Sequence, residues 1–313
     1  MKKNFLIVAL LFLVSIIPEM VLKADSPGTV GFEFLRTQVG ARPSAMGGAF
    51  VAVSGDLNSI YYNPAGIADI KSPTGSFTYL KHLLDFHSGF MGGILPQWWG
   101  NLGLGIHYMN FGSFTKTTST EPEGTGETFG AYSFSISLAY GSKFFKHLSY
   151  GWSLKYIRSS IDTYTSDAMA IDLGAIFHVP WMKDLNIGAG ITNLGKTRTP
   201  FINTKEDLPR NLKAGFSKRL EHLPLLLSFE FYKYVDDIWQ WALGGEFTLR
   251  EGLFFRLGYN AVGRDSKVEA AGDKLAGLNL GLGFIWQTYH LDYSFSSFGE
   301  VGSLNRVTFS ASF

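Results

Sequence analysis

Three residues near the C-terminus have the side chains of a serine hydrolase triad. His290, Asp292 and Ser294 are spaced two apart and therefore share one face of a predicted strand. A triad needs its nucleophile within about 3 Å of the base, whereas side chains two apart on a strand project in parallel about 7 Å apart. The spacing therefore favours a polar wall, and we expect no catalytic residues and no enzyme activity.

The other residue types offer little further chemistry. The chain has seven histidines and no cysteine, and the histidines lack the short spacings of a metal site. Gly188 with Gly190, and Gly281 with Gly283, lie within predicted strands, where they leave room on the inner side and do not form dinucleotide-binding loops. A net charge of +1 without a basic patch argues against a nucleic-acid partner. We expect neither metal nor cofactor.

The segments that would position such residues alternate between apolar and polar side chains. One apolar face consists of Tyr132, Phe134, Ile136, Leu138 and Tyr140, with small residues between them. A strand that crosses a bilayer obliquely needs about 9 to 11 residues, with an outward apolar band between aromatic girdles. This segment therefore indicates a membrane-spanning strand. The alternative is a water-soluble β-sandwich, whose aromatic faces would pack together in a core.

Fourteen segments show this alternation, and the chain has few charges. Charged residues make up 17% of the sequence and hydrophobic residues 46%. The segments lie at 74–84, 88–95, 101–111, 129–141, 149–161, 167–179, 184–194, 209–219, 224–234, 239–249, 253–262, 275–286, 288–297 and 304–313. Single-chain bacterial barrels have an even number of strands. The sequence therefore predicts an all-β fold, a transmembrane antiparallel β-barrel of about 14 strands over residues 73–313.

The connections between these segments alternate in length. Short connections are expected at 96–100, 180–184, 250–252 and near Gln287, and long polar ones at 112–128, 195–208 and 263–274. Such alternation is typical of barrels with short periplasmic turns and longer outside loops. All seven tryptophans lie at or near predicted strand ends, where indole rings suit the lipid headgroup region.

Residues 1–24 have the pattern of a secretory signal peptide. Two lysines precede an apolar run at 5–17, and Ala24 is the expected cleavage site. Pro18 ends the run before it reaches the roughly 20 residues of a transmembrane helix. Without a cysteine, the exported chain has no disulfide and no lipoprotein anchor. We expect it in the outer membrane of a Gram-negative-type bacterium.

Residues 25–72 do not alternate and are predicted to form a hatch, or plug, inside the barrel. The stretch 40–66 is rich in glycine, and Pro43 and Pro64 are incompatible with a regular ladder. A barrel of this strand number has a lumen between that of small barrels, which side chains fill, and that of open porins. The lumen therefore needs filling, and the plug would limit passage.

Charged residues of both signs are expected on the inward faces of the strands. They are Lys155, Asp172, Lys213, Glu230, Glu246, Arg256, Asp292 and Arg306. An unpaired charge in a narrow lumen is costly, so these residues should pair with one another or with Arg42 and Asp56 of the plug. The inward apolar residues are equally consistent with an apolar path for a ligand and with packing against the plug.

A lateral opening is a further hypothesis from the second predicted strand. Gly92 and Gly93, followed by Pro96, would break its ladder, because proline lacks a donor and glycine weakens pairing. The kinked strand would then leave a gap in the wall that the plug guards.

Two parts of the chain resemble known families. The last strand alternates up to Phe313, which resembles the C-terminal signal that the barrel-assembly machinery recognises in bacterial outer-membrane proteins. The plug contains the motif residues Gly40, Arg42, Met46, Gly47, Gly48, Asp56, Asn63, Pro64, Ala65 and Gly66. This pattern resembles the opening of the PorV/PorQ family, part of a wider group of barrels similar to the fatty-acid transporter FadL. The resemblance implies about fourteen strands and an N-terminal hatch in the lumen.

Two functions fit this fold. The first is passage of hydrophobic small molecules across the outer membrane through a plugged lumen. The second, which the PorV/PorQ resemblance implies, is a structural or interaction component of type IX protein secretion. The expected partners are outer-membrane lipid, the barrel-assembly machinery, and either hydrophobic small molecules or secretion-system proteins. The modest outside loops leave little surface for docking a large protein, which favours the transporter.

Overall fold

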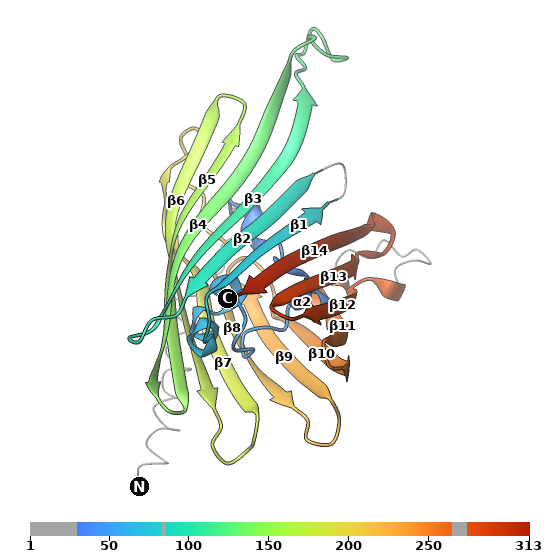
Figure 1. Ribbon diagram of the computed structural model, residues 1–313. Helices are drawn as coiled ribbons and strands as arrows, with labels where there is room; N and C mark the ends of the chain where they lie inside the picture. Colours follow the sequence, from blue (N-terminus) through green and yellow to red (C-terminus); the bar gives the residue numbers. More distant parts are fainter. Residues whose placement is uncertain (1–29, 83–85, 265–273) are drawn as a thin grey trace.

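Fourteen antiparallel strands close into a single barrel in the computed structural model, which describes residues 30–82, 86–264 and 274–313 (Figure 1). Each strand pairs with its neighbours in sequence, and β1 pairs with β14 to close the ring. The predicted all-β antiparallel barrel and its strand number are confirmed. The predicted signal peptide, residues 1–24, and the first residues of the predicted hatch lie outside the described residues.

The strands follow the predicted segments closely. They are β1 Thr74–Lys81, β2 His87–Leu95, β3 Asn101–Thr115, β4 Thr128–Phe145, β5 Leu148–Ile161, β6 Tyr164–His178, β7 Leu185–Thr199, β8 Asn211–Arg219, β9 Leu225–Tyr234, β10 Gln240–Arg250, β11 Leu253–Asn260, β12 Leu278–Trp286, β13 Tyr289–Ser297 and β14 Ser303–Ser312. The loop expected from residue 112 onward instead continues as strand. Phe114 there lies opposite Phe129, with ring centroids 5.5 Å apart, and such cross-strand aromatic pairs stabilise a ladder.

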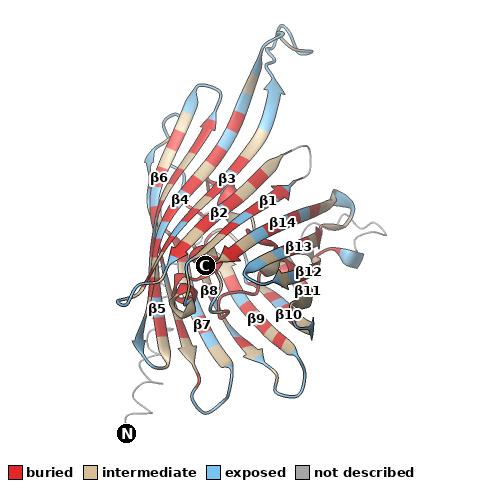
Figure 2. Ribbon diagram, viewed as in Figure 1, coloured by how far each residue is buried: buried red, intermediate tan, exposed pale blue. Residues whose placement is uncertain are grey.

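The barrel wall is apolar outside and polar inside. Along β4, Ile136 and Leu138 are 39% and 48% exposed, whereas Ser135 and Ser137 are buried. Figure 2 shows the same alternation along most strands. A water-soluble sandwich would bury its apolar faces in a core, so that alternative is wrong, and the surface is that of a membrane-spanning barrel. Within the described ranges, no helix is both long enough and apolar enough to cross a membrane.

The two ends of the barrel differ in their connections, as predicted. One end, called here the short-turn end, carries the C-terminus and the two-residue connections 146–147, 251–252 and 287–288. The other, the long-loop end, carries the long connections 116–127, 200–210 and 261–277, together with the two-residue connection 162–163. The β3–β4 hairpin projects from this end well beyond its neighbours (Figure 1).

Residues 30–73, called here the N-terminal segment, contain only short helices. These are η1 Glu33–Arg36, α2 Ala41–Ala45, α3 Ser59–Tyr62 and η2 Pro64–Asp69. Four fully buried side chains of the segment share an apolar cluster with inward-facing wall residues of β2, β4 and β9. The segment supplies Met46, Phe50, Ile60 and Ile67, and the wall supplies Phe90, Ile94, Ala139 and Leu226. The main apolar core therefore lies between this segment and the inner face of the wall.

Glycines on the inner face make room for the backbone of the N-terminal segment. A Cβ atom at Gly151 of β5 would lie 2.5 Å from the backbone nitrogen of Ala65, closer than any side chain allows. Gly141, Gly188, Gly244 and Gly258 face backbone atoms of the segment in the same way, and Gly92, Gly174 and Gly281 face its side chains. Of the strand glycines predicted to make room, Gly190 and Gly283 instead approach neighbouring wall residues.

Strand β2 is continuous, which corrects the expected break at Gly92 and Gly93. Its pairing with β1 and β3 shows no register shift. Glycine retains its N–H, so both residues take part in the ladder. Pro96 lies after the last strand residue, where its missing donor removes no ladder bond. The expected break in the ladder is therefore not found among the described residues of this strand, and the lateral opening stays a prediction.

Candidate functional site

A chain of ion pairs joins the N-terminal segment to the barrel wall. Arg42 binds Glu246 of β10 through two contacts of 2.7 Å and Asp56 through one of 2.8 Å. Glu246 also contacts Arg256 of β11 at 2.7 Å, and Arg256 contacts Asp292 of β13 at 2.6 Å. Burial lowers the pKa of Arg42, but the two carboxylates outweigh it and raise the pKa above its ordinary value. The predicted pairing between segment and wall is found.

A second buried carboxylate binds the backbone of the segment. Glu230 of β9 accepts hydrogen bonds from the N–H groups of Phe50 and Val51, at 2.9 and 2.8 Å. Serine hydroxyls of β8 and β9 donate to two carbonyl groups of the same stretch. Residues 49–52, which belong to no helix or strand, therefore have wall partners for two of their N–H groups and two of their carbonyl groups.

The Asn63-Pro64-Ala65-Gly66 element forms a compact turn. The Asn63 side chain accepts a hydrogen bond from the Ala65 N–H at 3.1 Å. It also donates to a carbonyl of the segment at 2.6 Å and to one of β6 at 3.3 Å. Pro64 occupies the start of η2, where no N–H is needed. The side chain of Ser59 lies against Gly66 and leaves no space for a Cβ.

The remaining motif residues shape the chain around α2. Gly40, Gly47 and Gly48 have φ angles of 76°, 68° and 84°, which favour glycine. Met46 is fully buried against the wall. Asn260 of β11 donates to the Gly47 carbonyl at 2.7 Å. These conformations and contacts explain why the stretch needs these residue types.

Apolar side chains fill the lumen beside β3, β5 and β6. Phe34 and Leu35 of η1, with Phe32 before it, pack against the wall residues Met109, Ile157, Ala168 and Ala170 and against Leu208 of the β7–β8 connection. His107 of β3 lies here too, with its ring centroid 5.3 Å from that of Phe34. Both of its ring nitrogens are buried without a hydrogen-bond partner among the described residues. This side of the lumen is therefore packed, mainly by apolar side chains, with the buried ion pair of Lys155 and Asp172 beside them.

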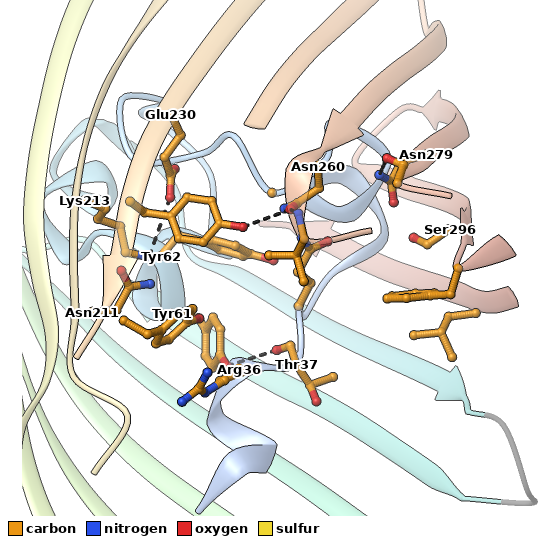
Figure 3. A pocket seen from close by; sticks show the side chains of 18 of the residues that line it. Arg36, Thr37, Tyr61, Tyr62, Asn211, Lys213, Glu230, Asn260, Asn279 and Ser296 are labelled. Atoms are coloured by element: carbon orange, nitrogen blue, oxygen red, sulfur yellow. Dashed lines mark hydrogen bonds and ion pairs between the residues drawn. The ribbon is translucent and has the colours of Figure 1, made fainter. Parts of the chain in front are cut away.

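A cavity of about 320 Å³ lies between the N-terminal segment and strands β8, β9 and β11–β14. Figure 3 shows Tyr61, Tyr62, Lys213 and Glu230 on one side of it, with Asn279 and Ser296 facing them. Residues of four connections at the long-loop end also line it: His82, Asp237, Val262 and Phe298. The cavity is therefore reached from the long-loop end.

Tyrosines give this cavity an amphipathic wall. The Tyr61 hydroxyl lies 2.5 and 2.9 Å from two carbonyl oxygens of the segment, which share its one proton, and Tyr62 donates to a third carbonyl at 2.9 Å. Burial raises the pKa of both phenols, so they remain neutral donors. Lys213 lies 5.7 Å from the Tyr62 ring centroid, and Arg36 lies 4.5 Å from that of Tyr234. Cations at these distances are attracted to the ring faces.

His290, Asp292 and Ser294 do not converge, in agreement with the sequence argument. The Asp292 carboxylate is bound by Arg256. The Ser294 hydroxyl is buried and has no hydrogen-bond partner in the described part of the chain.

The structure does bring together another set of these residue types, which sequence reasoning missed. Ser149 Oγ lies 3.1 Å from His178 Nε2, and His178 Nδ1 lies 2.8 Å from Asn186 Oδ1. Ser149 is 0% exposed, and His178 Nε2 also lies 3.4 Å from Asp69 at the end of η2. A serine without solvent access cannot reach a substrate, so these contacts tie η2 to the wall.

Comparisons with known proteins show the fold and no sequence relationship. No protein-family model and no curated protein sequence matches the chain, so neither supports the PorV/PorQ resemblance. The toluene transporter TbuX of Ralstonia pickettii is similar in structure, with a TM-score of 0.62 and 14% identity over 88% of this chain and 98% of that one. The CymD monoaromatic hydrocarbon channel is also similar, with a TM-score of 0.62 and 12% identity over 88% of this chain and 97% of that one. A Pseudomonas aeruginosa FadL homologue has a TM-score of 0.60 and 9% identity over 88% of this chain and 99% of its own. The chain therefore has a FadL-like barrel fold.

Proposed function

We propose that the protein passes hydrophobic small molecules across the outer membrane through a lumen that its N-terminal segment plugs. The observation that carries the proposal is the packing of residues 40–66 against inner-face glycines on many strands. The apolar outer face supports the membrane location. Two proteins with this fold, a toluene transporter and a monoaromatic hydrocarbon channel, support the ligand class and a non-enzymatic role.

The contacts of the segment are consistent with a plug that moves. Passage beyond the cavity requires the segment to shift, because the lumen beside β3, β5 and β6 is packed. The segment is joined to the wall by the apolar cluster, by ion pairs and by side-chain hydrogen bonds, not by a β-ladder. Polar contacts of this kind exchange for contacts with water at modest net cost. A ligand in the cavity lies next to two side chains of the segment, Tyr61 and Tyr62.

The plug is tested by single-channel conductance in planar bilayers. Deleting residues 40–60 should raise conductance well above that of the intact protein, because the segment no longer fills the lumen. Deleting 119–124, in the β3–β4 connection, is the matched control and should leave conductance unchanged. Heat-modifiable gel mobility shows whether each barrel is folded. Equal conductance of the intact and the 40–60-deleted barrels, both folded, would mean that the segment does not restrict passage.

The ligand class is tested by uptake. Cells that express the protein should take up labelled toluene faster than the same cells without it. Equal uptake, with the barrel present in the outer membrane, would overturn the transport proposal.

A component of type IX secretion is the second candidate function. The observation that favours it is the β3–β4 hairpin, which projects beyond the rim and offers a surface for a protein partner (Figure 1). Co-purification of secretion-machine proteins with the intact barrel, and their loss after deletion of 119–124, would support it. Toluene uptake without such co-purification would favour transport.

Two targeting features belong to the same proposal. Residues 1–24 direct export, and Phe313 is the residue that the barrel-assembly machinery reads. The Phe313 side chain is 79% exposed, while its N–H donates to the Pro73 carbonyl at 2.8 Å. Deleting Phe313 should lower the amount of heat-modifiable barrel in the outer membrane, and normal amounts would contradict this role.

A further inference from the structure

Arg306 of β14 is a buried cation without a carboxylate partner among the described residues. It is 2% exposed, and its guanidinium donates to the Gln38 carbonyl at 3.1 Å and to Ser296 Oγ at 2.9 Å. A guanidinium has five N–H donors, so donors remain for the cavity that Arg306 lines. Buried charges normally have a counter-charge, because desolvation is costly.

The other charged groups of the cavity already have partners. Arg36 contacts Asp236 at 2.6 Å and Glu33 at 2.9 Å. Glu230 accepts two backbone N–H groups and lies 4.0 Å from Lys213. The Asp237 carboxylate accepts the N–H of the following residue. In the described part of the chain, the cation of this cavity that lacks an anion is therefore Arg306.

We propose that this cavity binds a small aromatic carboxylate, with the carboxylate on Arg306 and the ring among the tyrosines. The proposal rests on the proposed function and names its ligand class more closely. A carboxylate matches the fork of a guanidinium through two parallel hydrogen bonds. Aromatic rings pack favourably against one another in offset or edge-to-face geometry, and Tyr61, Tyr62, Tyr232 and Tyr234 all line the cavity.

The size of the cavity favours one ring over a long chain. Its volume of about 320 Å³ is near the lower limit of ligand pockets, roughly 300 to 1,000 Å³. The polar groups that line it, among them Asn279 and Ser296, suit a molecule with one charged end. A long alkyl chain would instead need a continuous apolar wall.

Calorimetry on the purified full-length barrel in detergent tests the proposal with three probes. Benzoate has both the ring and the carboxylate, benzyl alcohol has the ring without the charge, and hexanoate has the charge without the ring. Benzoate should bind at least tenfold more tightly than either of the other two. Arg306→Gln should reduce benzoate affinity to that of benzyl alcohol and leave benzyl alcohol binding unchanged. Arg306→Lys should retain part of the preference.

A second variant keeps the test decisive if Arg306→Gln fails to fold. Asn279→Asp is nearly isosteric and adds a negative charge to the cavity, so it should also weaken benzoate binding at least tenfold. Arg219→Gln, at the short-turn end of β8, is the control and should change nothing. Heat-modifiable mobility is checked for every variant.

The outcomes separate this inference from the proposed function. Equal affinity for benzoate and benzyl alcohol would overturn the anion site, while binding of the neutral ring would leave the transport proposal standing. Hexanoate binding as tight as that of benzoate would overturn the aromatic preference. Binding of none of the probes, together with no toluene uptake, would contradict the proposed function itself.

Discussion

Arg42 is the residue through which the N-terminal segment is most firmly joined to the wall. Arg42→Met keeps a similar stem but removes the charge, which leaves Asp56 without its cation and Glu246 with Arg256 alone. Removing one partner of a buried ion pair costs about 3–5 kcal/mol. The temperature at which the barrel loses its compact gel mobility should therefore fall, and conductance should rise as the segment loosens.

The matched control for this prediction is Arg198→Met. Arg198 lies 3.8 Å from Asp167, but its side chain is 61% exposed, and surface pairs contribute only about 0–1 kcal/mol. Its melting temperature and conductance should stay near those of the intact protein. If Arg42→Met behaves like Arg198→Met, the ion pairs do not hold the segment.

Sequence reasoning identified which residues face the lumen but not which of them meet. The face of each strand residue follows from the two-residue period, so the charged inner wall and its pairing with Arg42 and Asp56 could be predicted. The specific partner could not, because Arg42 and Glu246 are 204 residues apart. Glu230 binds backbone N–H groups about 180 residues away, and no local pattern encodes such a contact. The same holds for the contact between Ser149 and His178.

At the scale of elements, the fit between the segment and the wall depends on glycine. Gly151→Val places methyl groups where the backbone of Ala65 now lies, since even a Cβ would be 2.5 Å from its nitrogen. Valine is a favourable strand residue, so β5 itself should persist. We therefore expect displacement of the segment, with higher conductance and intact heat-modifiable mobility.

Gly75→Val is the comparison for that change. Gly75 is also a strand glycine, in β1, but nothing lies within 4 Å of its Cβ position. Its conductance should match that of the intact barrel. Equal conductance of the two valine variants would show that the segment does not need the space at Gly151.

The alternating pattern predicted every strand of the barrel, because one face of each strand meets lipid and the other meets polar groups. It failed where that contrast ends. Beyond Gly112, β3 continues into polar sequence through cross-strand pairs such as Phe114 with Phe129. The prediction for Gly92 was also wrong. This glycine was expected to break the ladder, but it is a point of close approach, because Leu57 of the segment lies 2.7 Å from its Cβ position. Sequence alone does not separate these two uses of glycine.

For the whole molecule, the closed barrel was predictable and the cavity was not. The cavity lies between an irregular segment and six strands, so its shape depends on how these parts pack. Arg306 shows what the sequence could not predict about this cavity. The sequence predicts an inward charge there that finds a partner, whereas the structure shows no carboxylate beside it among the described residues. A position that departs from the expected pairing is informative about ligands, because natural proteins break such rules most often at functional sites.

The orientation of the barrel decides which compartment the cavity faces. The three longest connections all lie at the end opposite the C-terminus, and bacterial barrels place their short turns in the periplasm and their longer loops outside. The long-loop end, and with it the cavity, should therefore face the outside. An epitope tag inserted within 116–127 should be labelled by antibody on intact cells. The same tag at 251–252 should be labelled only after the outer membrane is permeabilised.

The 116–127 insertion lies in an exposed connection, where added residues are tolerated. Heat-modifiable mobility is checked for both tagged barrels, so that a failure to label reports on topology and not on folding. Labelling of the 251–252 tag on intact cells, with the other tag protected, would mean that the barrel has the opposite orientation in the membrane. The cavity would then open to the periplasm, and a ligand would meet the N-terminal segment before Arg306. The two arrangements differ in which step the segment controls, because a plug on the outer side of a binding site limits capture, whereas one on the inner side limits release.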